Sequence, residues 1–276
     1  MNSKKCRSFA VNSLILILSV FALFPLFWIC ITAMKTQGEI LREPLSITPN
    51  LQALRENMTE VWGRADWLLY YRNTIILTIS VWAVQMVVAI PAAYAFAILK
   101  FRGAGIFFLL VLMRLMISPE STMLSNYMTV LHLGAYDTMF GIMLPYIVSA
   151  QAIFMFRQAF RQLPSALYDS AKIDGCGDFH YMIRIGVPLI KPYITAFSII
   201  TCVYQWNAFF WPMLITKTPE KRILPIAMTF FGLQAESGSE WGLTMTAAIL
   251  VSFPLLLLFV IFQKQFVNSF VTSGIK

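Results

Sequence analysis

The sequence predicts an all-α integral membrane protein with six transmembrane helices. Of its 276 residues, 58% are apolar and only 12% are charged, whereas a soluble domain carries roughly 25% charged residues. The mean hydropathy is +0.70, and we count six apolar runs that fit helices crossing a bilayer, which takes about 20 residues each. This composition excludes a soluble enzyme, a disordered chain and a collagen-like fibre.

The first apolar run follows Lys4, Lys5 and Arg7 and is about 25 residues long, longer than the apolar region of a signal peptide. We therefore interpret it as a retained helix. Prolines inside several runs do not exclude a span, because neighbouring helices and ordered waters satisfy the backbone groups that a proline frees. The six expected spans are residues 9–34, 73–99, 105–117, 139–156, 187–215 and 243–262.

Charge sets the expected orientation. Both termini and residues 157–186 belong to a side with twelve Lys and Arg residues against three aspartates. Segments 35–72 and 216–241 belong to a side with eight basic residues against ten acidic ones. The positive-inside rule places the first side in the cytoplasm, so both termini are expected there. Short helices are expected outside the spans, around residues 51–62 and within 119–134.

The segment between the fourth and fifth spans carries the strongest functional pattern. Pro164 suits the first turn of a helix, and Gly175 suits the left-handed residue that ends one. We expect a helix of about ten residues between them, followed by a second short helix from Asp178 that carries Phe179. Two short amphipathic helices around a glycine turn suit a groove on another protein, although the pattern also fits a loop lying on the membrane.

A spaced motif in this segment consists of Asp169-Ser170-Ala171, Asp174-Gly175, Pro188 and Pro192. It resembles the EAA loop of binding-protein-dependent ABC importers, in which a coupling helix fits a cleft in the cytoplasmic ATPase. Asp169 stands where that family usually has glutamate, and Ser170 and Cys176 stand where it usually has alanine. The resemblance implies an ATPase-coupling role for Asp169, Ser170, Ala171, Asp174, Gly175, Phe179, Pro188 and Pro192.

Further motifs are Arg72-Asn-Thr-Ile75, Ala92-Ala-Tyr-Ala95, Leu144-Pro145, Gln205-Trp-Asn-Ala-Phe-Phe-Trp-Pro212, Trp241-Gly242 and Val271-Thr-Ser-Gly-Ile-Lys276. They resemble the carbohydrate-uptake branch, specifically the second permease subunit of maltose-type and glycerol-3-phosphate-type importers. The resemblance implies a type I ABC importer permease fold in a bacterial plasma membrane. The charge distribution predicts a cytoplasmic N-terminus at residues 1–8, followed by one permease domain over 9–276. The implied solute is a sugar, an oligosaccharide, a polyol or glycerol-3-phosphate.

The resemblance also implies the partners. The chain has no phosphate-binding GxxxxGK[ST] sequence, so ATP and its Mg²⁺ are expected in two copies of a separate ABC ATPase. This chain is expected to bind no cofactor and to be a transporter subunit rather than an enzyme. A second homologous permease, an extracytoplasmic substrate-binding protein and the lipid bilayer complete the expected partners, and nucleic acid is not among them.

Arg114 lies about nine residues into the third expected span, where an unpaired charge costs at least a few kcal/mol. One interpretation is a contact with an anionic substrate on the translocation path. The other is a structural pair with Glu120 or with the partner permease.

Several aromatic and amide residues have two interpretations as well. They stack on and hydrogen-bond a sugar ring, or they pack the helices and anchor them at the membrane interface. These candidate substrate-path residues are Asn126, Tyr127, Trp206, Asn207 and Phe210.

Two other classes of membrane protein fit the sequence less well. An intramembrane hydrolase needs a nucleophile with a base, or paired aspartates, and no acid lies inside an expected span. An ion-coupled secondary transporter, the main alternative, usually has intramembrane acids or an inverted repeat, and neither is visible. His132 and His180 are expected on opposite sides of the membrane, so they do not form a joint metal or nucleophile site.

Overall fold

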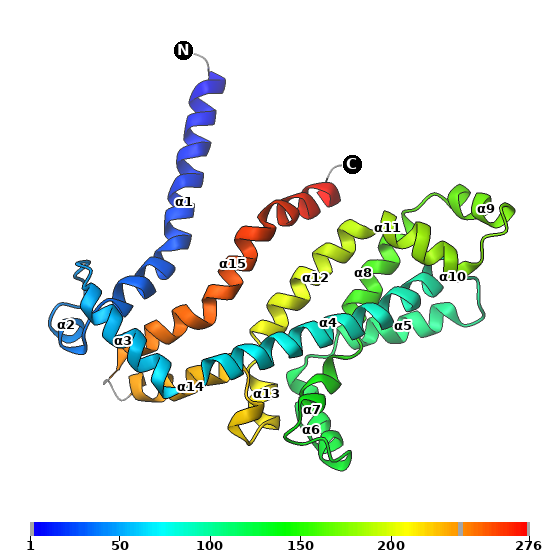
Figure 1. Cartoon of the computed structure of the whole chain (residues 1–276). Coiled ribbons are helices and arrows are strands. Elements are labelled where there is room, and N and C mark those ends of the chain that lie inside the picture. Colours follow the sequence, from blue (N-terminus) through cyan, green and yellow to red (C-terminus); the bar gives the residue numbers. More distant parts are fainter. Residues whose placement is uncertain (1–2, 237–239, 275–276) are drawn as a thin grey trace. The chain divides into compact units, whose positions relative to one another are not determined.

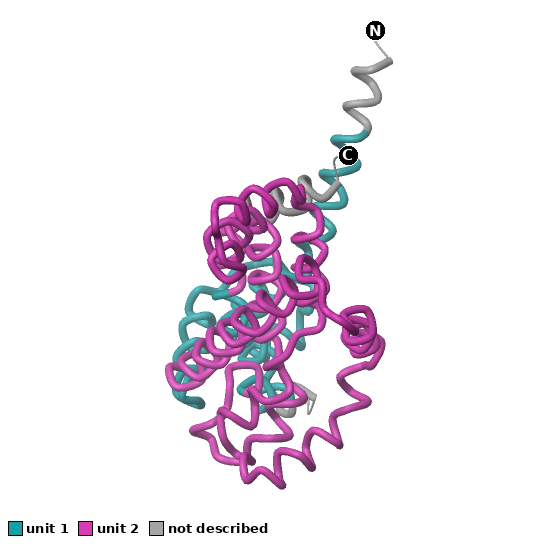
Figure 2. Tube along the Cα trace, turned by 90° about the vertical axis from the view of Figure 1, so that its right-hand side faces the viewer, with its two compact units in different colours: residues 1–67, 227–254 teal, residues 68–226, 255–276 magenta. Residues whose placement is uncertain are grey.

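The computed structural model describes residues 3–236 and 240–274, and these residues contain helices and no strand (Figure 1). They form two compact units, Met1–Trp67 with Ala227–Pro254 and Leu68–Ile226 with Leu255–Lys276 (Figure 2). The end of the predicted tail motif, residues 275–276, and residues 237–239 of the predicted outer segment lie outside the described residues.

The α-helices are α1 (Ser3–Ala33), α2 (Gln37–Arg42), α3 (Leu51–Arg64), α4 (Trp67–Ala97), α5 (Ala104–Leu115), α6 (Met123–His132), α7 (Met139–Met143), α8 (Ala150–Arg161), α9 (Ser165–Ile173), α10 (Asp178–Tyr181), α11 (Val187–Leu189), α12 (Lys191–Trp206), α13 (Phe210–Ile215), α14 (Leu224–Glu236) and α15 (Trp241–Gly274). Three 3₁₀ turns, η1 (Glu120–Thr122), η2 (Leu144–Tyr146) and η4 (Pro219–Lys221), and one π-helical turn, η3 (Met182–Gly186), lie between them.

Three helices are long and apolar enough to cross a membrane without a break: Val11–Ala33, Trp67–Ala97 and Trp241–Gln263. Three further helix pairs qualify only if each bent pair counts as one span, which gives up to six spans among the described residues. The all-α fold with six candidate spans is therefore confirmed. Prolines 25, 91 and 254 lie inside α1, α4 and α15, as expected for helices whose freed backbone groups are satisfied by neighbours.

The third expected span corresponds to α5, and the short helix expected within residues 119–134 is found as η1 and α6. The fourth span differs from the prediction because it is not straight. The chain bends by 98° between α5 and the Glu120–His132 helices, and by 45° between Met139–Tyr146 and α8. Pro119 lies directly before η1 and Ser149 caps the N-terminus of α8. Proline and a serine cap favour the start of a new helix over continuation of the previous one, so each break has a local cause.

The boundaries predicted for the fifth span are wrong. Residues 187–215 contain α11, α12 and α13, and α12 meets the preceding helices at 76°. The helix α14 lies within the predicted outer segment 216–241. At 13 residues it is shorter than a span, and for that reason hydropathy did not identify it.

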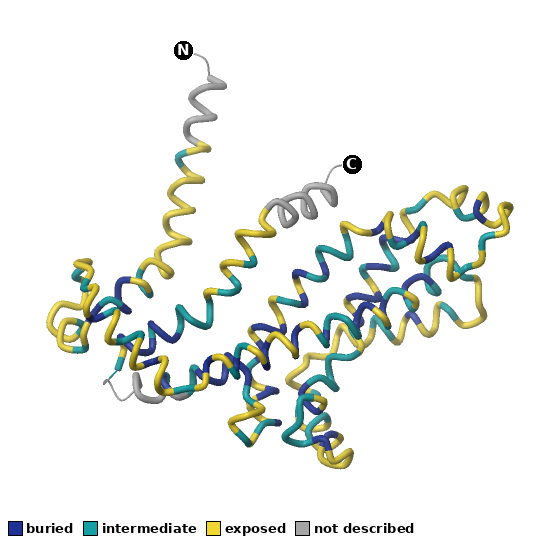
Figure 3. Tube along the Cα trace, in the orientation of Figure 1, coloured by how far each residue is buried: buried dark blue, intermediate teal, exposed yellow. Residues whose placement is uncertain are grey.

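In the first unit, the side chains of α1 from Val11 to Phe27 are largely exposed (Figure 3), which suits a helix that faces lipid. The Asn57 amide of α3 donates to the carbonyls of Ala33 and Lys35, at 2.9 and 3.1 Å. Lys35 is buried and its Nζ donates to the Pro44 carbonyl at 3.2 Å. These contacts join the end of α1 to α3, which confirms the helix predicted around residues 51–62.

In the second unit, aromatic side chains pack where α4, α8, α10 and α12 meet. Tyr94 of α4 contacts Phe160 edge-on at 5.7 Å between ring centroids, and Phe156 contacts Phe197 at 5.5 Å. The Arg157 guanidinium lies 3.8 Å from the centroid of the Phe108 ring. Fully buried alanines on α4 and α8, such as Ala93 and Ala152, allow the helices to approach closely.

Candidate functional site

The first candidate site is the segment from α9 to α11. The helix α9 begins after Pro164, which is its N-cap rather than its first helical residue. Gly175 has φ +78°, its N–H donates to the Lys172 carbonyl at 3.0 Å, and the Cys176 N–H donates to the Ala171 carbonyl at 2.9 Å. This pair of bonds is a Schellman motif, so the predicted glycine ending of the helix is confirmed.

Most of the predicted coupling residues present an exposed surface. Asp169, Ser170 and Asp174 are exposed, whereas Ala171 is buried against the unit. Ile173 is 86% exposed and Phe179 is 73% exposed. Two large apolar side chains on either side of an exposed turn suit burial against another protein.

Pro188 and Pro192 have a different position from the rest of the motif. Pro188 lies in the first turn of α11 and Pro192 in the first turn of α12, on the two sides of the 76° bend. A proline fixes φ and suits a first turn. These two prolines therefore shape the bend behind the exposed turn.

A cluster around Asp178 was missed by the sequence analysis. One Asp178 oxygen, Oδ1, accepts hydrogen bonds from Tyr168 at 2.7 Å and Tyr94 at 3.4 Å, and pairs with Lys172 Nζ at 2.8 Å. The hydrogen bond to Asp178 raises the pKa of Lys172 above its usual value. Asp178 thus joins α9, α10 and α4. The spacing of Tyr168 and Lys172, four residues apart on one helix face, was the signal available in the sequence.

The π-helical turn η3 follows the cluster. Gly186 ends this turn against α8, and a Cβ atom added there would lie 2.9 Å from Cε1 of Phe160. Tyr181 precedes the turn, is 1% exposed, and its ring lies edge-on to Tyr168 at 5.1 Å. π-helical turns are rare overall, but many of those that occur lie at functional sites.

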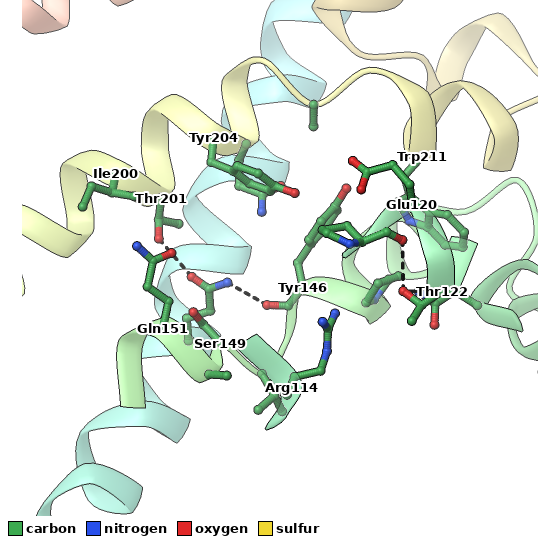
Figure 4. Close-up of a pocket in the computed structure, with 18 of the residues that line it drawn as sticks. Arg114, Glu120, Thr122, Tyr146, Ser149, Gln151, Ile200, Thr201, Tyr204 and Trp211 are labelled. Carbon is green, nitrogen blue, oxygen red and sulfur yellow. Dashed lines mark hydrogen bonds between the residues drawn. The ribbon is translucent and has the colours of Figure 1, made fainter. Parts of the chain in front are cut away.

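The second candidate site is a cavity of about 710 Å³ inside the second unit (Figure 4). It lies where α5, α8 and α12 end or begin, next to the breaks in the bent spans. Four predicted substrate-path residues line it: Arg114, Asn126, Asn207 and Phe210. The lining also contains groups that the sequence analysis did not select, among them Gln85, Tyr146, Gln151, Tyr204 and Gln205.

Two predicted path residues lie elsewhere in the described chain. Trp206 is 8% exposed and its ring lies 6.5 Å from that of Tyr71. Tyr127 contacts Tyr136 edge-on at 6.2 Å. Neither lines the cavity, so their contacts correspond to the packing interpretation.

Polar contacts hold part of the cavity wall. Gln85 Nε2 donates to the Tyr146 carbonyl at 2.7 Å, and Thr201 Oγ1 donates to Gln85 Oε1 at 3.1 Å. Gln205 is 1% exposed, and its Oε1 has no hydrogen-bond partner among the described residues. A buried amide oxygen without a donor costs free energy, which marks Gln205 as a candidate for contact with a ligand.

Arg114 lies in the last turn of α5, beside the break, rather than in the middle of a straight span. Its Nη1 donates to the Ile117 carbonyl at 3.0 Å. Glu120 accepts a hydrogen bond from the Ser118 hydroxyl. Among the ion pairs of the described residues there is none between Arg114 and Glu120, so the pairing with Glu120 that was one of the predicted alternatives is not formed.

Residues 8–271 match the family of binding-protein-dependent transport system inner membrane components. The chain belongs to this family. The α9–α10 segment and the cavity are therefore features of a membrane-embedded transporter subunit, and the resemblance of its motifs to such importers is confirmed.

Curated relatives of this inner membrane component match almost its whole length. The arabinooligosaccharides transport system permease protein AraQ of Bacillus subtilis (strain 168) is 30% identical over 97% of this chain and 95% of its own. The sn-glycerol-3-phosphate transport system permease protein UgpE of Brucella abortus (strain 2308) is 28% identical over 95% of this chain and 96% of its own.

A solved structure, a bacterial ABC transporter involved in the import of the acidic polysaccharide alginate, has a similar chain. The TM-score is 0.80 at 21% identity, over 96% of this chain and 98% of the other. At this identity the likeness establishes the fold, which is that of an ABC importer subunit.

Proposed function

We propose that this chain is a permease subunit of an ATP-driven importer of a carbohydrate-type solute: a sugar, an oligosaccharide, a polyol or glycerol-3-phosphate. The observation that carries the proposal is the family match over residues 8–271. The relatives named for arabinooligosaccharides and for sn-glycerol-3-phosphate support the solute class.

The exposed α9–α10 segment is the proposed contact with the ATPase. Its Schellman turn fixes the direction of the chain after α9, and Ile173 and Phe179 offer apolar surface beside the Asp169 and Asp174 carboxylates. ATP binding and hydrolysis, with Mg²⁺, belong to two copies of that ATPase. In transport, closure of the ATPases moves this segment, and the bent helices behind it transmit the movement to the cavity.

The remaining partners follow from the same proposal. A second homologous permease completes the membrane part, and an extracytoplasmic binding protein delivers the solute. The α9–α10 segment and both termini then face the cytoplasm of a bacterial cell, as the charge distribution predicts. The cavity, at about 710 Å³, has a volume typical of small-molecule sites.

Co-purification tests this proposal. The tagged chain is extracted from its native membrane in mild detergent, and the proteins that accompany it are identified by mass spectrometry. We expect an ATPase and a second permease, and solute uptake that depends on ATP. A reproducible homo-oligomer without an ATPase, with uptake driven by an ion gradient, would favour the secondary transporter instead.

A further inference from the structure

The cavity in the second unit contains one positively charged side chain. Arg114 lines it, and among the bonds described for its guanidinium group only Nη1 has an acceptor, the Ile117 carbonyl at 3.0 Å. A guanidinium has five N–H donors and binds carboxylates and phosphates with two parallel bonds. Figure 4 shows the Arg114 side chain extending from the end of α5 into the cavity.

A helix N-terminus adds positive potential to the same cavity. The helix α8 has 12 residues, and Ser149, Ala150 and Gln151 at its start line the cavity. Ser149 caps the Ala152 N–H at 3.2 Å, which leaves the N–H groups of Ala150 and Gln151 without an acceptor inside the helix. Such N–H groups and the helix dipole favour a negative group.

Gln205 favours a hydrogen-bond donor on the ligand, whereas Arg114 and the start of α8 favour a negative group. Gln205 lines the cavity, and its Oε1 is buried and lacks a donor among the described residues. An O–H or N–H group of a ligand that reached this oxygen would satisfy it. Tyr146 and Tyr204 lie edge-on at 6.0 Å in the same wall. Aromatic rings beside amide groups suit the C–H face and the hydroxyls of a sugar ring.

We propose that this cavity binds a hydroxylated solute that carries an acidic group, a carboxylate or a phosphate, with the acidic group at Arg114 and a hydroxyl at Gln205. This inference rests on the proposed function and narrows its solute class. It makes Arg114 the residue that discriminates acidic from neutral solutes.

The negative charge of Glu120 disfavours the binding of an acidic group in this cavity. It lines the same cavity, and its carboxylate already accepts the Ser118 hydroxyl. Because Glu120 repels a second negative group, removal of its charge strengthens the binding of an acidic solute. The affinity for a neutral solute does not change when the charge of Glu120 is removed. Substitutions of Arg114 and of Glu120 are therefore expected to change the preference for acidic solutes in opposite directions.

The test uses the purified complex of this chain with its co-purifying partners in lipid nanodiscs, without the binding protein. Binding is measured by calorimetry with matched probes: glucose, glucuronate and glucose 6-phosphate, and glycerol and glycerol 3-phosphate. We expect at least one acidic probe to bind about tenfold more tightly than its neutral counterpart. Uronates and phosphates in the same series show which acidic group is preferred.

Four variants locate the effect. Arg114→Gln removes the preference, and Arg114→Lys keeps part of it, because lysine retains the charge but not the paired bonds. Glu120→Gln increases it. Arg102→Gln, a change of an exposed arginine outside the cavity, leaves it unchanged.

Equal affinity for the acidic and neutral members of each series overturns the inference, as does the absence of binding by every acidic probe at millimolar concentration. So does an Arg114→Gln variant that loses the second permease during purification while binding is unchanged, because Arg114 then pairs with that subunit. In each case, ATP-dependent uptake and the co-purifying ATPase still decide the proposed function independently.

Discussion

Gly175 allows the turn after α9, which is proposed to contact the ATPase, to be tested by backbone conformation alone. Its φ is +78°, and a Cβ atom added there would meet no atom within 4 Å. Substitution by alanine therefore introduces no steric collision, and the whole cost lies in the left-handed conformation. For a residue with a Cβ atom this conformation costs roughly 1–2 kcal/mol. That cost lowers the population of the native turn about 5- to 30-fold relative to other conformations of the same residues.

Two other substitutions at this residue bracket alanine. Asparagine sometimes takes the left-handed position that ends a helix, so Gly175→Asn should retain more of the turn than Gly175→Ala. Proline fixes φ near −65° and has no N–H, so Gly175→Pro loses both the conformation and the 3.0 Å bond to the Lys172 carbonyl. Gly177 has φ −72° and open space around a Cβ, which makes Gly177→Ala the matched control.

The assay is solute uptake and ATP hydrolysis in proteoliposomes that contain the whole complex. We expect solute transported per ATP to fall in the order Gly175, Asn, Ala, Pro, with Gly177→Ala at the native level and every variant inserted in the membrane. Normal uptake by Gly175→Pro would refute the reasoning. Equal values for the Ala and Asn variants would show that the left-handed turn does not limit coupling.

Three further predictions concern single side chains. Asp178→Asn should lower solute transported per ATP, because it removes the pair with Lys172, and Asp178→Glu should restore part of it; the same proteoliposomes measure both, and equal values for all three would contradict a role in coupling. Gly141→Ala should reduce the yield of folded complex in gel filtration, because its Cβ would lie 2.2 Å from the Ala135 carbonyl oxygen, whereas Gly105→Ala, which has open space, should not. Phe156→Ala empties a fully buried position and should destabilise the unit by about 3–5 kcal/mol; an unchanged thermal unfolding temperature would contradict this.

The sequence predicted the spans well where the determining property is local and additive. Hydropathy summed over about 20 residues identifies α1, α4 and α15, and the glycine ending of α9 follows from backbone sterics at one residue. The bends at 98° and 76° were not predicted, because a hydropathy sum does not respond to the direction of the helix axis. The helix α14 is apolar but too short to register.

Only part of each candidate site could be predicted, because the sequence shows local patterns but not contacts between distant residues. Asp169 and Gly175 were found because their motif is contiguous, whereas the contact of Tyr94 with Asp178 joins residues 84 positions apart. Arg114 stood out as a charge in an apolar run. Gln205 lies within a motif, but only the packed structure shows that its amide oxygen is buried without a donor among the described residues.

The π-helical turn η3 places one additional residue in the helix that joins the exposed segment to α11. Each residue of an α-helix turns the chain by about 100°, so the additional residue determines which side of the helix Val187 and Pro188 present to their neighbours. Removal of a single residue from Met182–Gly186 would keep composition, charge and hydropathy almost unchanged and still rotate the two ends against each other by that angle. In alignments of related chains, the length of this stretch therefore carries more structural information than the identity of its side chains.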